Sequence, residues 1–165
     1  AHAGDARATE LSWRGETSLG ALVRDQFGGN CRLVGFTTHS GRVTAADGWL
    51  RRPRSRAVRP APLGSIENLF HQVGLPAFWC DFTKPDESTD MLLRPRLQRG
   101  IGLVYHPVHG TRGNWFNACV TGQFDAVIHG EHTRATEPLH AVTRPRGTVV
   151  PEPRITGRNV TKIPA

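Results

Sequence analysis

The stretch "FDAVIH", residues 124–129, decides the fold predicted for this chain. It is short and almost continuously apolar, and two similar runs occur at 77–82 ("AFWCDF") and 101–105 ("IGLVY"). Runs of this length and composition are typical of strands that are buried on both faces of a sheet. We therefore predict three buried strands at these positions.

Two helices and one hairpin are predicted from the remaining patterns. Residues 16–29 place apolar side chains on one helical stripe, with a Thr or Ser to cap the start and Gly28 to end it. Residues 65–74 repeat this arrangement between Ser65 and Gly74. The β-formers of 31–46 are interrupted by a Ser-Gly pair, which predicts two strands joined by a tight turn.

The order of these elements predicts the fold class and the domain organisation. Helices that alternate with strands indicate an α/β protein with a mixed, largely parallel sheet flanked by helices. Residues 1–140 are expected to form this domain. Residues 141–165 are rich in Pro and Arg without a periodic apolar face, which predicts a flexible tail.

The positive charge of the chain raises nucleic acid as a partner. The formal net charge is +7, and Arg residues concentrate in "RRPRSRAVRP" at 51–60. This segment has no interleaved aromatic residues and no helical periodicity, so a solvated, Pro-stiffened loop is the simpler interpretation. We expect no nucleic-acid partner, and we keep a basic module that binds nucleic acid or another polyanion as the rival hypothesis.

Cysteine usage and hydropathy predict the cellular setting. Cys31, Cys80 and Cys119 are odd in number and widely spaced in apolar surroundings, which favours buried free thiols and a reducing, cytoplasmic location. Apolar runs fall short of the ~20 residues that cross a bilayer, so no membrane association is expected. The Cys and His spacings also lack the pattern of a structural zinc site.

The most suggestive polar group is "HAGD" at 2–5, which we expect on a loop that follows a strand. Loops at the carboxyl ends of strands are where α/β sheets bind ligands. His2 can serve there as a base, an electrophile or a metal ligand, and Asp5 can orient it or Arg7. The alternative is that both side chains only satisfy backbone groups at a turn.

The remaining histidines are weighed against ordinary surface and turn roles. His39 ends a predicted strand and can reach a cleft. His129 and His132 flank Glu131 with a spacing that a metal site can use. Surface or turn roles remain the default for all of them, and we expect neither a metal nor a cofactor.

Several stretches together resemble the carboxyl half of erythromycin esterase-like proteins, over about residues 1–140. They are "AHAGDARATE", "LGALVRDQFG", "RLVGFTTHSGRVTAA", "VRPAPLGSIENLFH", "RGIGLVY" and "QFDAVIHGEHTRATEPL". Members of that family carry a His-Asn-x-His-x-Gly-Asp motif, and residues 1–5 match its second half. The resemblance therefore implies that the chain is the incomplete carboxyl half of a larger α/β domain, cut inside this motif, with the missing amino-terminal half as its partner.

What the resemblance implies about function is hydrolysis of a carboxylic ester, in the founding members a macrolactone. A His acts as general base without needing a metal, and that base, its partner Glu and the charge-stabilising Arg residues belong to the amino-terminal half. His2 and Asp5 match the family motif and would support catalysis. Glu16 and His39 are further candidates because they lie at element ends near the same sheet edge. A small-molecule ester is the expected substrate, and we expect the chain alone to be inactive.

Overall fold

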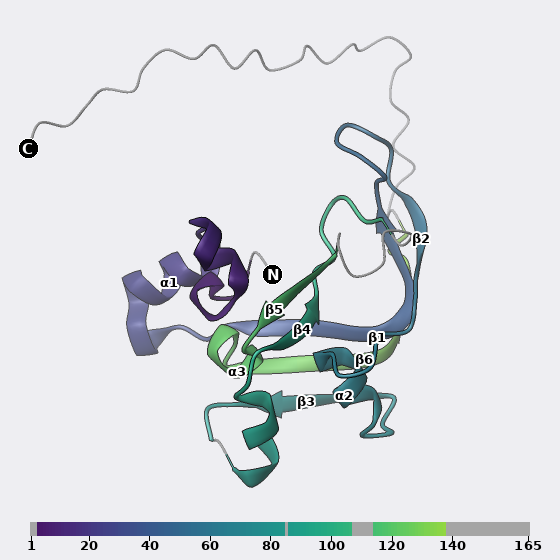
Figure 1. Cartoon of the computed structure of the whole chain (residues 1–165). Coiled ribbons are helices and arrows are strands. Elements are labelled where there is room, and N and C mark those ends of the chain that lie inside the picture. Colours follow the sequence, from purple (N-terminus) through teal and green to yellow (C-terminus); the bar gives the residue numbers. More distant parts are fainter. Residues whose placement is uncertain (1–2, 85, 107–113, 138–165) are drawn as a thin grey trace, which may run out of the picture.

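A four-stranded mixed sheet forms the centre of the computed structural model, which describes residues 3–84, 86–106 and 114–137 (Figure 1). Its strand order is β2-β1-β6-β3, with β1 (Val34–Ala45) and β6 (Ala126–Thr133) side by side. These two central strands are parallel, whereas β2 (Arg54–Val58) and β3 (Ala77–Asp81) pair antiparallel at the edges. The α/β class is confirmed, but the prediction of a largely parallel sheet is wrong.

The hairpin predicted within 31–46 is wrong, because β1 runs without a turn through Ser40 and Gly41. Gly41 has φ 125°, and its Cα lies opposite Thr133 of β6 in the register. A residue without a side chain can take this conformation inside the strand, so the Ser-Gly pair need not reverse the chain. The reversal comes later, and β2 then returns antiparallel from Arg54 opposite Ala45. Part of the predicted Arg-rich loop is therefore an edge strand.

One face of the sheet is covered and the other is open. Phe36, Ile128 and Trp79 lie next to one another on β1, β6 and β3, and are 78%, 40% and 67% exposed. Val127, adjacent to Ile128, is 1% exposed, so burial alternates along β6. The prediction that these strands are buried on both faces, and the picture of a sheet flanked by helices, are therefore wrong for the described residues.

Helix α2 (Ile66–His71) covers the other face. Ser65 caps it by accepting the N–H of Asn68, and Gly74, with φ 75°, follows its end. Ile66 and Phe70 pack into the main core with Val127 and Phe124. The predicted helix at 65–74 is thus confirmed in a shorter form, and it fixes which face of the sheet is buried.

Helix α1 (Leu19–Phe27) follows the 3-10 segments η1 (Ala6–Ala8) and η2 (Glu10–Arg14), and η3 (Gly28–Asn30) follows it. Ser18 caps α1, as the sequence allowed. Gly20 lies so close to the backbone of Ala3 and Gly4 that a Cβ atom would clash with it. The helix therefore packs through small residues, while Leu19, Leu22 and Phe27 of its predicted apolar stripe are exposed.

A second, two-stranded sheet crosses the first, as Figure 1 shows, and consists of β4 (Arg96–Arg99) and β5 (Trp115–Ala118). The short helices η4 (Glu87–Leu92) and α3 (Val120–Gln123) precede β4 and β6. The strand predicted at 101–105 is wrong, because only Val104 makes an isolated bridge, to Ala46. Tyr105 instead packs in a small core with Ala45 and Val58.

Three further predictions concern the tail, membranes and the cysteines. The tail predicted at 141–165 lies outside the described residues. Among the residues that the structure does describe, no helix combines the length and apolar character required of a membrane span. The cysteines are free thiols, but they are partly exposed rather than buried.

Candidate functional site

Polar side chains gather between α2 and the covered face of the sheet, where an apolar core would be expected. We call this group the α2 polar cluster. It consists of Thr37 and His39 on β1, Glu67 and His71 on α2, Arg99 on β4, and His129 and Glu131 on β6. The sheet members sit at alternate positions of two paired strands, so the pleat turns them toward the same face.

His129 is the most deeply buried histidine of the cluster, with 0% exposure. Its Nδ1 lies 2.9 Å from the Thr37 hydroxyl oxygen, and its Nε2 lies 3.9 Å from Glu131 Oε2 without a hydrogen-bond partner among the described residues. The rings of Phe70 and Phe78 pack against the imidazole. Burial lowers the pKa of His129 below its usual value, which favours the neutral imidazole.

His39 and His71 form a stacked pair, with ring centroids 3.9 Å apart and an interplanar angle of 13°. His71 Nδ1 also lies 2.7 Å from Glu131 Oε1, which joins α2 to β6. His39 is 7% exposed, and its Nδ1 is buried without a hydrogen-bond partner within the described part of the chain. Burial, and then repulsion from His71, lower the pKa of His39. The pair therefore combines a histidine that has an unpaired buried nitrogen with a second histidine that contacts a carboxylate.

Glu67 is a carboxylic acid that is 1% exposed on the inward side of α2. Burial raises its pKa to about 7, although a hydrogen bond from the Arg99 backbone opposes this rise. One carboxyl oxygen accepts that N–H at 2.9 Å, and the other has no hydrogen-bond partner in the described residues. Glu67 can therefore exchange a proton near neutral pH, as groups with shifted pKa values often do at functional sites.

Arg99 holds a positive charge beside Glu67. Its guanidinium donates to the carbonyl oxygens of His39 and Arg59 at 3.1 and 2.8 Å, and it lies 4.4 Å from the centre of the Trp115 ring. A cation held by carbonyls and an aromatic face keeps a fixed orientation. The cluster therefore contains a fixed cation, an acid that titrates near neutral pH and buried imidazoles.

A cavity of about 440 Å³ adjoins the cluster. Glu67, Arg99 and His129 line it, together with Ala3, the residue that follows His2 in the chain. Its lining also includes residues of the open face, such as Phe36 and Ile128. The loop of the "HAGD" motif and the α2 polar cluster therefore share one cavity, although their residues are far apart in the sequence.

The four predicted site residues occupy different places. His2 lies outside the described residues. Asp5 is 4% exposed at the start of η1, where its carboxylate accepts hydrogen bonds from Nε and Nη2 of Arg7 and lies 3.4 Å from Arg24. Burial raises the pKa of Asp5, but the hydrogen bonds from Arg7 outweigh this effect, so the net pKa is lowered.

Glu16 is exposed between η2 and α1, whereas His39 belongs to the α2 polar cluster. Asp5, Glu16 and His39 share no hydrogen bond or ion pair with one another in the described structure. The metal spacing considered for His129 and His132 also fails, because the two rings lie on opposite faces of β6. His132 meets Ser40 there, with 2.7 Å between its Nδ1 and the hydroxyl oxygen.

Sequence reasoning missed Glu67, His71 and Arg99. The available signal was weak, because Glu67 lies beside the apolar stripe of the predicted helix at 65–74 and not within it. Because β4 was not predicted, nothing placed Arg99 against that helix. The contact between His71 and Glu131 joins residues 60 positions apart and leaves no local pattern.

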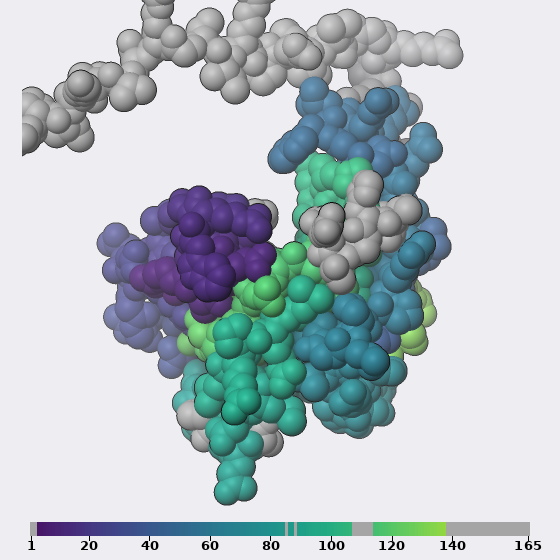
Figure 2. Space-filling view, in the orientation of Figure 1, coloured from purple at the N-terminus to yellow at the C-terminus, as the bar shows by residue number. Residues whose placement is uncertain are grey.

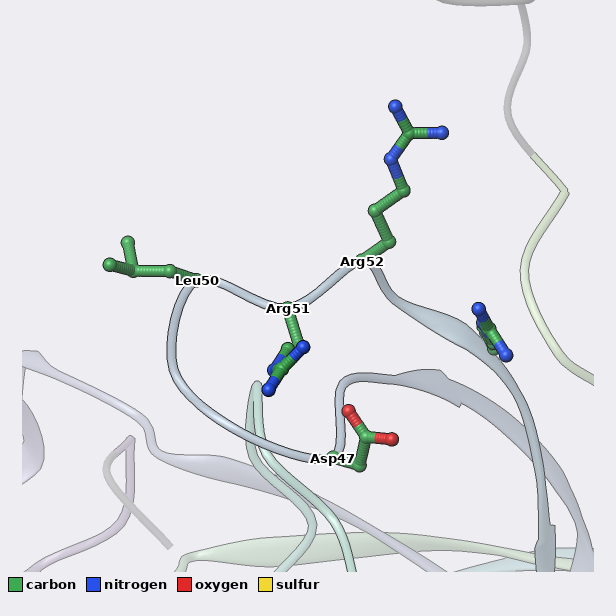
Figure 3. Close-up of a pocket in the computed structure, with 5 residues that line it drawn as sticks. Asp47, Leu50, Arg51 and Arg52 are labelled. Atoms are coloured by element: carbon green, nitrogen blue, oxygen red, sulfur yellow. The ribbon is translucent and has the colours of Figure 1, made fainter. Parts of the chain in front are cut away.

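The Arg-rich hairpin projects away from this site, at the upper right of Figure 2. Asp47, Leu50, Arg51, Arg52 and Arg54 line a pocket of about 690 Å³ there. Figure 3 shows the Arg51 and Arg52 side chains pointing in different directions, with the Arg52 side chain pointing away from the Asp47 carboxylate. Asp47 is also paired with Arg56 at 2.8 Å. This arrangement does not converge on one anion and gives the polyanion hypothesis no specific support.

The fold and site define part of an α/β protein with a buried histidine–carboxylate cluster beside its sheet. The chain belongs to the erythromycin esterase family, whose model matches residues 1–133. This confirms the resemblance drawn from the sequence.

Two solved structures share the fold. One is a Bacillus cereus protein, with a TM-score of 0.66 and 14% sequence identity over 81% of this chain. The other is described as a succinoglycan biosynthesis protein, with a TM-score of 0.63 and 16% identity over 81% of this chain. The matches cover 32% and 31% of those proteins, so this chain spans about a third of their length.

Proposed function

We propose that this chain forms the carboxyl-terminal part of a carboxylic ester hydrolase that acts on a macrolactone or a related ester. The main observation that supports this proposal is that Ala3, Glu67 and Arg99 line one cavity, in a chain of the erythromycin esterase family. His2, next to Ala3, would hold the substrate or the attacking water through a hydrogen bond. Asp5 would support the loop by holding Arg7 and Arg24.

The cluster would contribute charge to this reaction. The transition state of ester hydrolysis carries negative charge on the carbonyl oxygen, and a fixed cation such as Arg99 favours that charge. Glu67 would exchange a proton at the cavity wall, because its pKa lies near neutral pH. His39 would act through the cluster, and the general base that activates water would come from outside this chain.

We propose that the partner of this chain is an amino-terminal part of the same enzyme. We also propose that the enzyme is cytoplasmic. The chain spans about a third of the matched structures. The apolar row of Phe36, Ile128 and Trp79 is also exposed on the open face of the sheet. An apolar surface of this kind is typical of one that another part of a protein covers.

The test is steady-state hydrolysis of a panel of macrolides and aryl esters. We expect residues 1–165 alone to show no turnover above background, and a version extended by the amino-terminal half to be active. His2→Ala in the extended version should reduce kcat/KM by an amount equivalent to roughly 1–3 kcal/mol, the usual cost of leaving a buried polar partner unpaired. Arg52→Gln, at the hairpin tip, is the control and should leave turnover unchanged. Robust activity of residues 1–165 alone, or full activity of His2→Ala, would contradict the proposal.

The polyanion hypothesis makes a different prediction for the same protein. It requires retention on nucleic acid that falls steeply with added salt and disappears when Arg51, Arg52, Arg54 and Arg56 are replaced. We expect no such retention.

A further inference from the structure

We propose that His39, His71 and Glu131 form a binding site for one divalent transition metal ion of the zinc type. One potential ligand atom from each residue lies within 4.8 Å of the other two. The residues come from β1, α2 and β6, so the site exists only in the folded protein. This proposal does not rest on ester hydrolysis.

The donor set determines which class of ion fits. Two imidazoles and one carboxylate are a common zinc donor set, which leaves a fourth position open for water or another ligand. Ca²⁺ and Mg²⁺ prefer sites built from oxygen ligands and fit this set poorly. The sequence spacing of His129, Glu131 and His132 would have suggested a different group, but His132 lies on the other face of β6.

An unpaired buried nitrogen is the independent observation that indicates a ligand. His39 Nδ1 is buried and has no hydrogen-bond partner within the described residues. A buried polar atom normally has a partner, because leaving it unpaired costs free energy. The lowered pKa of His39 favours the neutral imidazole, the form that binds metals. If His39 binds the ion through Nδ1, coordination gives this nitrogen the partner that it lacks.

His129 supports the site from behind Glu131. Its Nε2 lies 3.9 Å from Glu131 Oε2, while its Nδ1 contacts the Thr37 hydroxyl at 2.9 Å. If the hydroxyl donates to Nδ1, the ring proton sits on Nε2 and faces the carboxylate. The separation of 3.9 Å is longer than a hydrogen bond, so His129 would orient the ligating carboxylate, as outer groups do in metal sites, only after the two side chains approach each other.

His71 provides the entrance and must move for the ion to bind. Its side chain is 47% exposed, whereas that of Glu131 is 20% exposed. A metal lies in the plane of each imidazole that binds it, and two nearly parallel stacked rings cannot share one ion in this way. The exposed ring of His71 therefore has to turn out of the stack toward Glu131, and metal binding should clamp α2 to the sheet.

The experiment titrates the full chain, freed of any His tag and stripped with EDTA, with Co²⁺ and Zn²⁺. We expect one equivalent to bind by calorimetry, Co²⁺ to give the visible absorption of a four- or five-coordinate site, and Zn²⁺ to raise Tm. His71→Ala and Glu131→Gln should each weaken binding at least tenfold. Both positions are partly exposed, so the variants should fold, which circular dichroism checks.

The matched control is His132→Ala, which removes a histidine from the same strand on the opposite face. It should keep the affinity of the unmodified chain. The proposal is overturned if the unmodified chain binds no ion, or if His71→Ala and Glu131→Gln, once shown to be folded, bind as well as His132→Ala. In either case the stacked pair is only a packing and hydrogen-bonding contact between α2 and β6.

Discussion

Glu67 on α2 accepts the backbone N–H of Arg99 on β4 at 2.9 Å, and so joins the helix that covers the main sheet to the second sheet. The other carboxyl oxygen of Glu67 is buried without a hydrogen-bond partner in the described structure. The connection therefore depends on a carboxylic acid whose charged form is poorly solvated. This relationship leads to a pH-dependent prediction.

Glu67 should destabilise the protein as the pH rises. Its pKa is about 7 in the folded protein against an ordinary value of 4.5, so between these values the native state holds a proton that the unfolded state has lost. The free energy of unfolding should therefore fall from pH 5 to pH 8 through this group, by roughly 3 kcal/mol at most. Glu67→Gln removes this contribution, so its stability relative to the unmodified chain should increase over the same interval.

Urea unfolding at pH 5 and pH 8 measures this difference, and the comparison between proteins cancels the groups that they share. Glu16→Gln is the matched control, because Glu16 is exposed. An equal pH dependence for Glu67→Gln and Glu16→Gln would show that Glu67 does not titrate in this range.

Ser18 should be important for the loop that carries the "HAGD" motif. Its hydroxyl donates to the carbonyl of Gly4 at 2.6 Å and accepts the N–H of Ala6 at 2.9 Å, in addition to capping α1. Ser18→Ala should reduce the free energy of unfolding by about 1–3 kcal/mol, because it leaves buried backbone groups unpaired. Thr17→Ala, at an exposed neighbouring position, should change it by less than about 0.5 kcal/mol. Urea denaturation tests both, and a similar effect of the two substitutions would refute the role given to Ser18.

Gly41 should be nearly irreplaceable in β1. It has φ 125°, and a Cβ atom there would meet the backbone of Thr133 on β6. Gly41→Ala should destabilise the protein by roughly 1–3 kcal/mol or more. An alanine is strained at this φ angle, and its Cβ atom would clash with the backbone of Thr133, which β-sheet pairing holds in place. Gly29→Ala should be close to neutral, because a Cβ atom there would meet nothing within 4 Å. Thermal melts of the two variants provide the comparison, and a native-like Tm for Gly41→Ala would contradict this account of the strand.

The open face of the sheet should make the isolated chain associate. Phe36 and Trp79 flank Ile128 in one exposed apolar row, next to the edge of β3 that has no partner strand among the described residues. Replacing both Phe36 and Trp79 with Thr, a good strand former, should shift the chain toward the monomer at a given concentration. Trp13→Thr is the control, since Trp13 is 86% exposed on η2 rather than on the sheet. Sedimentation at several concentrations measures the effect, and a monodisperse monomer before any substitution would show that the row does not drive association.

The sequence alone predicted those helices and strands whose formation depends on residues close together in the chain. Ser18 and Ser65 cap their helices by accepting backbone N–H groups only three residues away. The apolar stretch "FDAVIH" at 124–129 overlaps the first half of the central strand β6. Six stretches taken together, among them the partial motif at 1–5, also indicated the family, which the match over residues 1–133 confirms. Interactions of this kind act over short distances along the chain, so the order of residues reveals them.

Tertiary structure alone decided strand direction, the open face and the composition of the site. Ser40 and Gly41 form a turn pattern by sequence, but pairing with β6 holds them in an extended strand. Periodicity shows that a strand is apolar, but not whether a helix covers each face, and here Ile128 and Trp79 remain exposed. Glu131 meets His71 across 60 residues because α2 packs beside β6. The burial that shifts the pKa of Glu67 comes from this same packing, so the chemistry of the cluster is a property of the fold rather than of any single segment.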